Sequence, residues 1–228
     1  MTTINVPQLV REISSRLRAL ERLDAQTFRG FCREYSKRLA TAEPREVVEL
    51  ASRLIDQGGI EHRGMAYGLV HDHRGALASL KTRDVVELGR GIDSWGAVDS
   101  FAVYLAGPAW REGQISTARI RIWTRSKDRW WRRAAVVATV PLNSKAQGGR
   151  GDTPRTLEIC RLVVEDHDDM VVKALSWALR ELSKRDPEAV REFLDEHRDA
   201  LAARVVREVT NKLTTGLKNP RRTRRPGR

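Results

Sequence analysis

Residues 169–182 read DMVVKALSWALREL, and this stretch carries the pattern that decides the fold. Its large apolar residues recur at the three- and four-residue spacing of one helix face and do not alternate as in a strand. This apolar stripe consists of Val171, Leu175, Ala178, Leu179 and Leu182. The stretch therefore predicts an amphipathic α-helix, capped by Asp169 and buried along one side.

The helical period runs along most of the remaining chain, where the period of a strand is nearly absent. Helix starts are predicted where a capping residue precedes proline, at Thr153–Pro154 and Asp186–Pro187, and a helix end is predicted near Gly107–Pro108. Short connections imply antiparallel neighbours, so we predict an all-α fold of stacked antiparallel helical pairs, a repeat solenoid. A compact helical bundle is the alternative.

The charge of the chain points to a polyanionic partner. Lys and Arg number 42 against 30 Asp and Glu, which gives a net charge of +12. Residues 218–228, KNPRRTRRPGR, hold six basic residues and no acidic one, which is half of that excess. We predict a single helical domain over residues 1–217, followed by a basic, disordered tail over 218–228.

Cysteine usage and hydropathy indicate the compartment. Cys32 and Cys160 lie far apart and form neither a CxxC metal motif nor a disulfide framework, which fits a reducing environment. No apolar run approaches the roughly 18 residues of a membrane span, and the start of the chain lacks the layout of a signal peptide. We expect a cytoplasmic protein with no membrane partner.

Trp177 lies off the apolar stripe of its helix, with Lys173 and Arg180 beside it on the same face. A large aromatic side chain on a charged, non-core face is unusual unless it contacts a ligand. The position predicts a binding surface; the alternative is a tryptophan at the rim that packs on an adjacent helix.

Trp95 and Asp99 lie in GIDSWGAVDSFAVYLAG, Gly91–Gly107, where Ser94 or Asp93 is expected to cap a helix. The spacing of four residues places the indole and the carboxylate on one side, at the margin of the apolar face. Such a partly desolvated carboxylate predicts a site that holds a cation. The alternative is an ion pair between Asp99 and an arginine of a neighbouring helix.

A second arginine-tryptophan stretch, RWWRRAAVV, covers residues 129–137. On a helical wheel Arg132 falls on the polar side, whereas Arg133 lies on the flank of the apolar stripe. An arginine directed toward packed surface needs an acceptor, either a carboxylate or a phosphate. We expect Trp130 and Trp131 in the core and Arg133 in a functional role.

Trp95 with Asp99 in SWGAVDSF, Arg133 in WWRRAAVV and Trp177 in VKALSWALRE together resemble the signature of the AlkD family of DNA glycosylases. The resemblance is best over Glu61–Leu194. It implies HEAT-like repeats, and hence a solenoid with a concave, positively charged surface that binds DNA.

The resemblance also implies the roles of individual residues. Asp99 would be the catalytic carboxylate, and Trp95, Trp177 and Arg133 would bind the lesion-bearing nucleotide. Residues expected on the DNA backbone are Arg132, Lys173 and Arg180.

By the same resemblance, the chain would be a monofunctional glycosylase that excises cationic alkylpurines, of the 3-methyladenine and 7-methylguanine class, in base excision repair. Its partner would be double-stranded DNA with alkylated bases, bound by a monomer at the nucleoid. No cofactor or metal is expected, because no carboxylate or cysteine pattern completes a metal site around His62, His71 and His73.

Two other functions are open at this point. A noncatalytic relative with the same fold would bind distorted or branched DNA without releasing bases. A protein-binding helical scaffold would bind DNA weakly and without a steep dependence on salt.

Overall fold

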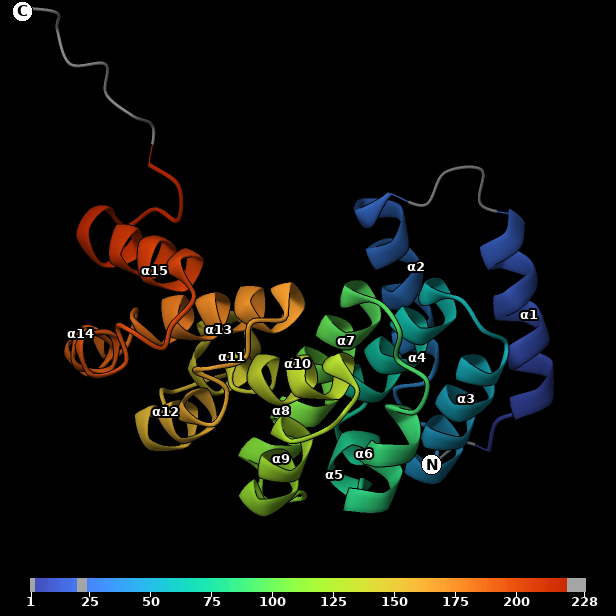
Figure 1. Ribbon diagram of the computed structural model, residues 1–228. Coiled ribbons are helices and arrows are strands. Elements are labelled where there is room, and N and C mark those ends of the chain that lie inside the picture. Colours follow the sequence, from blue (N-terminus) through green and yellow to red (C-terminus); the bar gives the residue numbers. More distant parts are fainter. Residues whose placement is uncertain (1–2, 20–23, 221–228) are drawn as a thin grey trace, which may run out of the picture. The chain divides into compact units, whose positions relative to one another are not determined.

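The computed structural model describes residues 3–19 and 24–220, and Figure 1 shows them as helices joined by loops. No β-strand occurs among these residues, which confirms the all-α prediction. No helix within them has the length and apolar character that a membrane span requires. Of the predicted tail over 218–228, the segment from residue 221 on lies outside the described residues.

Contacts divide the chain into two compact units, Met1–Arg119 and Ile120–Arg228, and each has its own buried core. The boundary falls inside the helix α9 (Thr117–Thr124). The expectation of one domain over residues 1–217 stays a prediction.

Unit 1 is organised around α4 (Ile60–Asp72), which packs against α2, α3, α5 and α7 (Figure 1). The other elements of this unit are α1 (Val6–Ala19), α2 (Ala25–Arg38), α3 (Pro44–Asp56), α5 (Arg74–Ser79), α6 (Thr82–Leu88), α7 (Trp95–Phe101), the π-helix η1 (Ala102–Ala106) and α8 (Gly107–Arg111). Met65, Ala66, Leu69 and Val70 of α4 are buried, so this helix supplies much of the core on which α7 rests.

Unit 2 is organised around α13 (Asp169–Leu182), which packs against α10, α11, α12, α14 and α15 (Figure 1). The other elements after α9 are α10 (Arg129–Val137), α11 (Val140–Asn143), the 3₁₀ helix η2 (Lys145–Gln147), α12 (Thr153–Arg161), α14 (Pro187–Glu196) and α15 (Ala203–Thr215). Every residue of the predicted stripe on α13 is at most 1% exposed, which confirms the buried face.

The predicted cap of α14 is correct, whereas the cap of α13 lies one residue earlier than expected. Asp186 caps α14 by accepting a hydrogen bond from the Ala189 amide at 3.1 Å. The cap of α13 is Asp168, whose carboxylate accepts from the Met170 amide at 2.9 Å, and Asp169 is the first helical residue. Two adjacent aspartates offer the same side chain at successive positions, so sequence alone does not separate them.

The cap of α12 is displaced in the same way. Asp152 accepts from the Arg155 amide at 3.1 Å, and Thr153, the expected cap, is the first helical residue. Pro154 then occupies the first turn, where its missing amide hydrogen costs no hydrogen bond within the helix.

The segment from α7 to α8 is one continuous helix, so the predicted end near Gly107–Pro108 is wrong. Proline has no amide hydrogen, and Pro108 cannot donate to the Tyr104 carbonyl four residues earlier. The structure solves this with a π-turn: the Gly107 amide donates to the Ala102 carbonyl, and His71 Nδ1 of α4 donates to the Tyr104 carbonyl oxygen at 3.0 Å. The histidine thus replaces the hydrogen bond that proline removes.

We predict that His71→Ala lowers the free energy of unfolding by about 1 kcal/mol, because the Tyr104 carbonyl loses its donor. Urea denaturation followed by circular dichroism measures this change. His167→Ala, which alters an exposed histidine of a loop, is the matched control and is expected to change stability by less than about 0.5 kcal/mol. Equal effects of the two substitutions would contradict the role given to His71.

Candidate functional site

The predicted site residues fall into two groups, one in each compact unit. Trp95 and Asp99 lie on α7 of unit 1. Unit 2 holds the others, with Arg132 and Arg133 on α10 and Lys173, Trp177 and Arg180 on α13. Each group is built by the packing of its own unit.

Trp95 is the first residue of α7, and its side chain is 63% exposed. Ser94 caps the helix by accepting from the Ala97 amide at 3.5 Å, as one of the two predicted caps. Asp99 follows one turn later and is half-buried, while Val98 beside it is fully buried. The indole and the carboxylate thus lie at the margin between core and solvent, where the sequence places them.

Two residues of α4 hold the loop that leads into α7. Arg63 Nη2 donates to the carbonyl oxygens of Arg90 and Gly91, both at 3.0 Å, and Nη1 donates to the Tyr67 hydroxyl at 3.2 Å. The Tyr67 hydroxyl in turn donates to the Leu88 carbonyl at 3.0 Å. These contacts fix the start of α7, and with it the position of Trp95.

Sequence reasoning missed Arg63 and Tyr67. The only signal is their spacing of four residues on one helix. In the loop, both side chains bind backbone carbonyls, which every residue type has. The residue types of the loop therefore do not predict these hydrogen bonds.

Ile60, an exposed apolar residue of α4, was also missed. Its side chain is 47% exposed and lies over Gly96, where an added Cβ would be 2.5 Å from Ile60 Cδ1. A side chain at position 96 would therefore displace the end of the Ile60 side chain. Two exposed apolar side chains, Ile60 and Trp95, thus belong to the segment where α4 meets the start of α7.

Arg133 is 5% exposed, as expected for an arginine on the flank of the apolar stripe. Its Nη1 donates to the Met170 carbonyl oxygen at 2.5 Å, in the first turn of α13. The predicted acceptors were a carboxylate or a phosphate, and this acceptor is a backbone carbonyl. The contact ties α10 to the beginning of the helix that carries Trp177.

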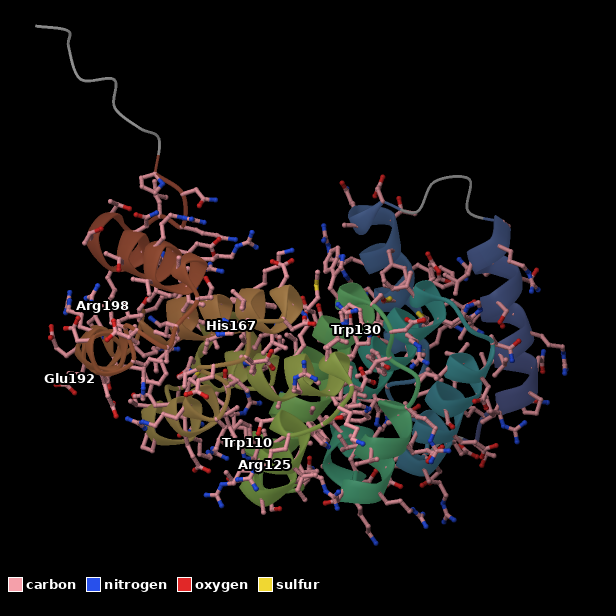
Figure 2. The ribbon with its side chains drawn as sticks, viewed as in Figure 1. Trp110, Arg125, Trp130, His167, Glu192 and Arg198 are labelled. Carbon is pink, nitrogen blue, oxygen red and sulfur yellow. The ribbon has the colours of Figure 1, made fainter. Side chains whose placement is uncertain are left out.

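Trp130 and Trp131 are half-buried, so their placement in the core is wrong. Trp131 packs on Trp123 with ring centroids 4.9 Å apart, and the Arg129 guanidinium lies 5.7 Å from the Trp130 ring, which is labelled in Figure 2. The core positions of α10 are filled by Ala134, Ala135, Val136 and Val137. Because these lie in the second half of the helix, the two tryptophans at its start are left at the edge.

Arg132 binds the protein with several of its donors. Its Nε donates to Asp166 Oδ2 at 2.6 Å, and Nη1 donates to the carbonyls of Ser126 and Lys127 at 3.0 and 3.1 Å. The side chain is 20% exposed. These bonds hold the loop before α10, and a contact with the DNA backbone stays a prediction.

Lys173, Trp177 and Arg180 are half-buried on α13, whereas the apolar stripe is fully buried. Their spacing of four and three residues places them along one face. Lys173 Nζ lies 2.6 Å from Asp169 Oδ2, and this ion pair, more than any other contact, lowers the pKa of the Asp169 carboxyl. Trp177 thus has a basic residue on each side, as predicted.

The two cysteine thiols are held in their protonated form. Burial raises the pKa of the Cys160 thiol to about 12, and burial together with the Asp72 charge raises that of Cys32 to about 12. Both thiols therefore stay protonated near neutral pH. In residues 3–19 and 24–220, no group of three or more His, Cys, Asp and Glu is placed to hold a metal ion.

A family model described as DNA alkylation repair enzyme matches residues 23–213. This range includes both groups of site residues and extends beyond Glu61–Leu194 at both ends. It confirms the family to which the tryptophan, aspartate and arginine motifs pointed. No curated protein and no solved structure matches the chain.

We predict that Arg63→Ala loosens the start of α7. The loss of hydrogen bonds to two loop carbonyls lowers the free energy of unfolding by about 1–3 kcal/mol and speeds amide exchange in residues 88–98. Urea denaturation and hydrogen–deuterium exchange measure the two effects.

The matched control is Arg83→Ala, because the Arg83 side chain is 92% exposed. It is expected to leave stability within about 0.5 kcal/mol of the wild type. Unchanged exchange in residues 88–98 of the Arg63 variant would show that the loop is held by other contacts.

Proposed function

We propose that this chain, which belongs to the DNA alkylation repair enzyme family, is a monofunctional DNA glycosylase for positively charged alkylpurines. Its substrates are bases of the 3-methyladenine and 7-methylguanine class in double-stranded DNA, and its reaction is hydrolysis of the N-glycosidic bond in base excision repair. The observation that carries the proposal is the pair of an exposed Trp95 and a half-buried Asp99, one turn apart on a helix whose start is held by α4.

The proposed reaction needs a carboxylate but no general acid. A purine alkylated at N3 or N7 is already cationic, so it departs as a neutral base and needs no proton from the enzyme. Positive charge then builds on the deoxyribose, as in the oxocarbenium-like states of glycoside hydrolysis. In the proposed mechanism Asp99 stabilises this charge and orients the attacking water.

Tryptophan is suited to a cationic lesion. The face of an indole attracts a cation with about 0.5–2 kcal/mol, and more strongly as water is excluded. We assign this contact to Trp95, whose side chain is 63% exposed, and to Trp177, which is half-buried. Arg133 completes the proposed site by binding a phosphate near the lesion, from a position that its bond to the Met170 carbonyl keeps fixed.

The proposal includes the HEAT-like solenoid implied by the resemblance, with a concave, basic surface for DNA. Arg132, Lys173 and Arg180 are its proposed backbone contacts, and they would set register and orientation rather than sequence preference. The enzyme is proposed to act as a cytoplasmic monomer without metal or cofactor.

The decisive experiment measures the release of free methylpurines from methylated duplex DNA in the presence of a chelator. We expect release by the wild type and a fall of about 10²–10³-fold in the single-turnover rate for Asp99→Asn, with DNA binding retained. The matched control is Asp93→Asn, which removes an exposed carboxylate of the preceding loop and is expected to leave the rate unchanged.

No release by folded wild-type protein that binds DNA would refute the glycosylase and favour a noncatalytic binder of distorted DNA. Weak DNA binding with a shallow dependence on salt would instead favour a protein-binding scaffold.

We predict that deletion of residues 218–228 weakens binding to undamaged duplex and reduces its dependence on salt, because six basic residues are lost. The single-turnover release rate at saturating protein is expected to be unchanged. Fluorescence anisotropy over a series of salt concentrations measures the slope. An unchanged slope would exclude the tail from DNA binding.

A further inference from the structure

Glu208 of α15 is a buried carboxylate that contacts α13 at Ser176, the residue before Trp177. It is 5% exposed, and its Oε2 accepts a hydrogen bond from the Ser176 hydroxyl of α13 at 2.6 Å. Lys218 Nζ lies 3.4 Å from the same oxygen. Burying a carboxylate costs free energy, and its partners offset this cost only in part. A glutamate at this position is therefore better explained by what it holds in place than by core packing.

Ser176 connects Glu208 to Arg180. The Arg180 Nε donates to the Ser176 hydroxyl oxygen at 3.2 Å, while that hydroxyl donates to Glu208. Among the residues that the structure describes, no hydrogen bond uses Nη1 or Nη2 of Arg180. The guanidinium is therefore oriented through Nε, and its two terminal nitrogens keep their donor capacity.

The charges around this network keep it ionised. Burial alone would raise the pKa of Glu208, but the Ser176 hydrogen bond and the Lys218 and Arg180 charges hold that pKa below its ordinary value. Burial lowers the pKa of Arg180, and the Glu208 and Glu181 charges oppose this effect. Arginine stays protonated in proteins, so one carboxylate lies between two cations.

Lys218 reaches this position because the chain turns back after α15. Gly216 has a φ of 73°, and its carbonyl accepts from Lys212 Nζ at 2.5 Å. Asn211 Nδ2 then donates to the Lys218 carbonyl at 3.1 Å, which holds the returning segment against α15. The first basic residue of the C-terminal segment is thereby fixed beside Glu208.

We propose that Ser176 and Glu208 are positioning residues that hold Arg180 and Lys218 as a phosphate-binding pair for the DNA backbone, next to Trp177. The inference rests on the proposed function in taking DNA as the ligand and Arg180 as a backbone contact. A phosphate accepts two hydrogen bonds from the terminal nitrogens of a guanidinium, and an ammonium adds a third donor and a second charge. Glu208 lowers the net charge of this surface by one. In return it orders the long side chains of Arg180 and Lys218 before DNA binds, which reduces the entropy cost of binding.

The same arrangement recurs at the other end of α13. Asp169 pairs with Lys173 of α13 at 2.6 Å and with Arg204 of α15 at 3.3 Å. Lys173 and Arg180 are seven residues apart, about 10 Å along a helix. Each of the two carboxylates thus lies between two cations and holds them in place on α13, α15 and the segment that follows. The distance between Lys173 and Arg180 corresponds to about three base-pair steps of 3.4 Å.

The test uses the salt dependence of binding to undamaged duplex, measured by fluorescence anisotropy with the full chain. Each lost phosphate contact lowers the slope of log K against log salt by about 0.9. We expect this loss in Arg180→Gln and in Lys218→Gln. Arg191→Gln is the matched control, because Arg191 is an exposed arginine of α14 that also pairs with a glutamate, Glu188. It is expected to leave the slope unchanged.

Glu208→Gln separates positioning from simple charge. Removing a negative charge from a DNA-binding face should tighten binding and steepen the slope if Glu208 only repels phosphate. Positioning predicts the opposite: binding weakens about 3- to 10-fold and the slope falls, although the protein becomes more positive. Tighter binding by Glu208→Gln, or unchanged slopes in the Arg180 and Lys218 variants, would overturn the proposal.

Ser176→Ala provides a second route if Glu208→Gln does not fold. It removes the bridge to Arg180 without changing any charge, and we expect the slope to fall as in Arg180→Gln. An unchanged slope in this variant would overturn the positioning role. Because undamaged DNA is used, a protein that releases no methylpurine but shows these slopes would refute the proposed glycosylase and leave the phosphate site intact.

Discussion

Burial of the apolar stripe of α13 determines where every polar side chain of that helix is directed. Val171, Leu175 and Leu179 are at most 1% exposed, and the helix packs against five neighbouring helices of unit 2. A helix fixed in this way cannot rotate without exposing its core face, at a cost of about 1.5–3 kcal/mol for each large side chain. Trp177, Lys173 and Arg180 must therefore lie at the margin of the buried face, where they are half-buried.

The two units support their site residues by different means. In unit 1, Arg63 and Tyr67 bind backbone carbonyls of the loop before α7, so the position of Trp95 depends on acceptors that carry no charge. In unit 2, carboxylates pair with Lys173 of α13, Arg204 of α15 and Lys218 after α15, so the position of these basic residues depends on charge. Salt and acid should consequently disturb the second arrangement more than the first.

What could be predicted from sequence followed from the geometry of single helices. The all-α class, the stripe of α13, the separate face of Trp177 and the marginal place of Asp99 all depend on residues within two turns of each other. The misplaced caps of α12 and α13 also have local causes, whereas other misses have causes that lie further away in the chain. Pro108 predicts a helix end, but the donor that the Tyr104 carbonyl loses is supplied by His71, more than thirty positions earlier. Likewise, the Ser176 and Glu208 pair joins two helices across 32 positions, which no spacing rule reveals.

The state of the two cysteines has a consequence for a protein whose family repairs alkylation. Electrophiles that methylate DNA also attack thiolates, which are far stronger nucleophiles than protonated thiols. With pKa values of about 12, Cys32 and Cys160 expose a thiolate fraction on the order of 10⁻⁵ at neutral pH. The surroundings that raise both pKa values thus make these two thiols poor targets for the reagents whose damage this family repairs.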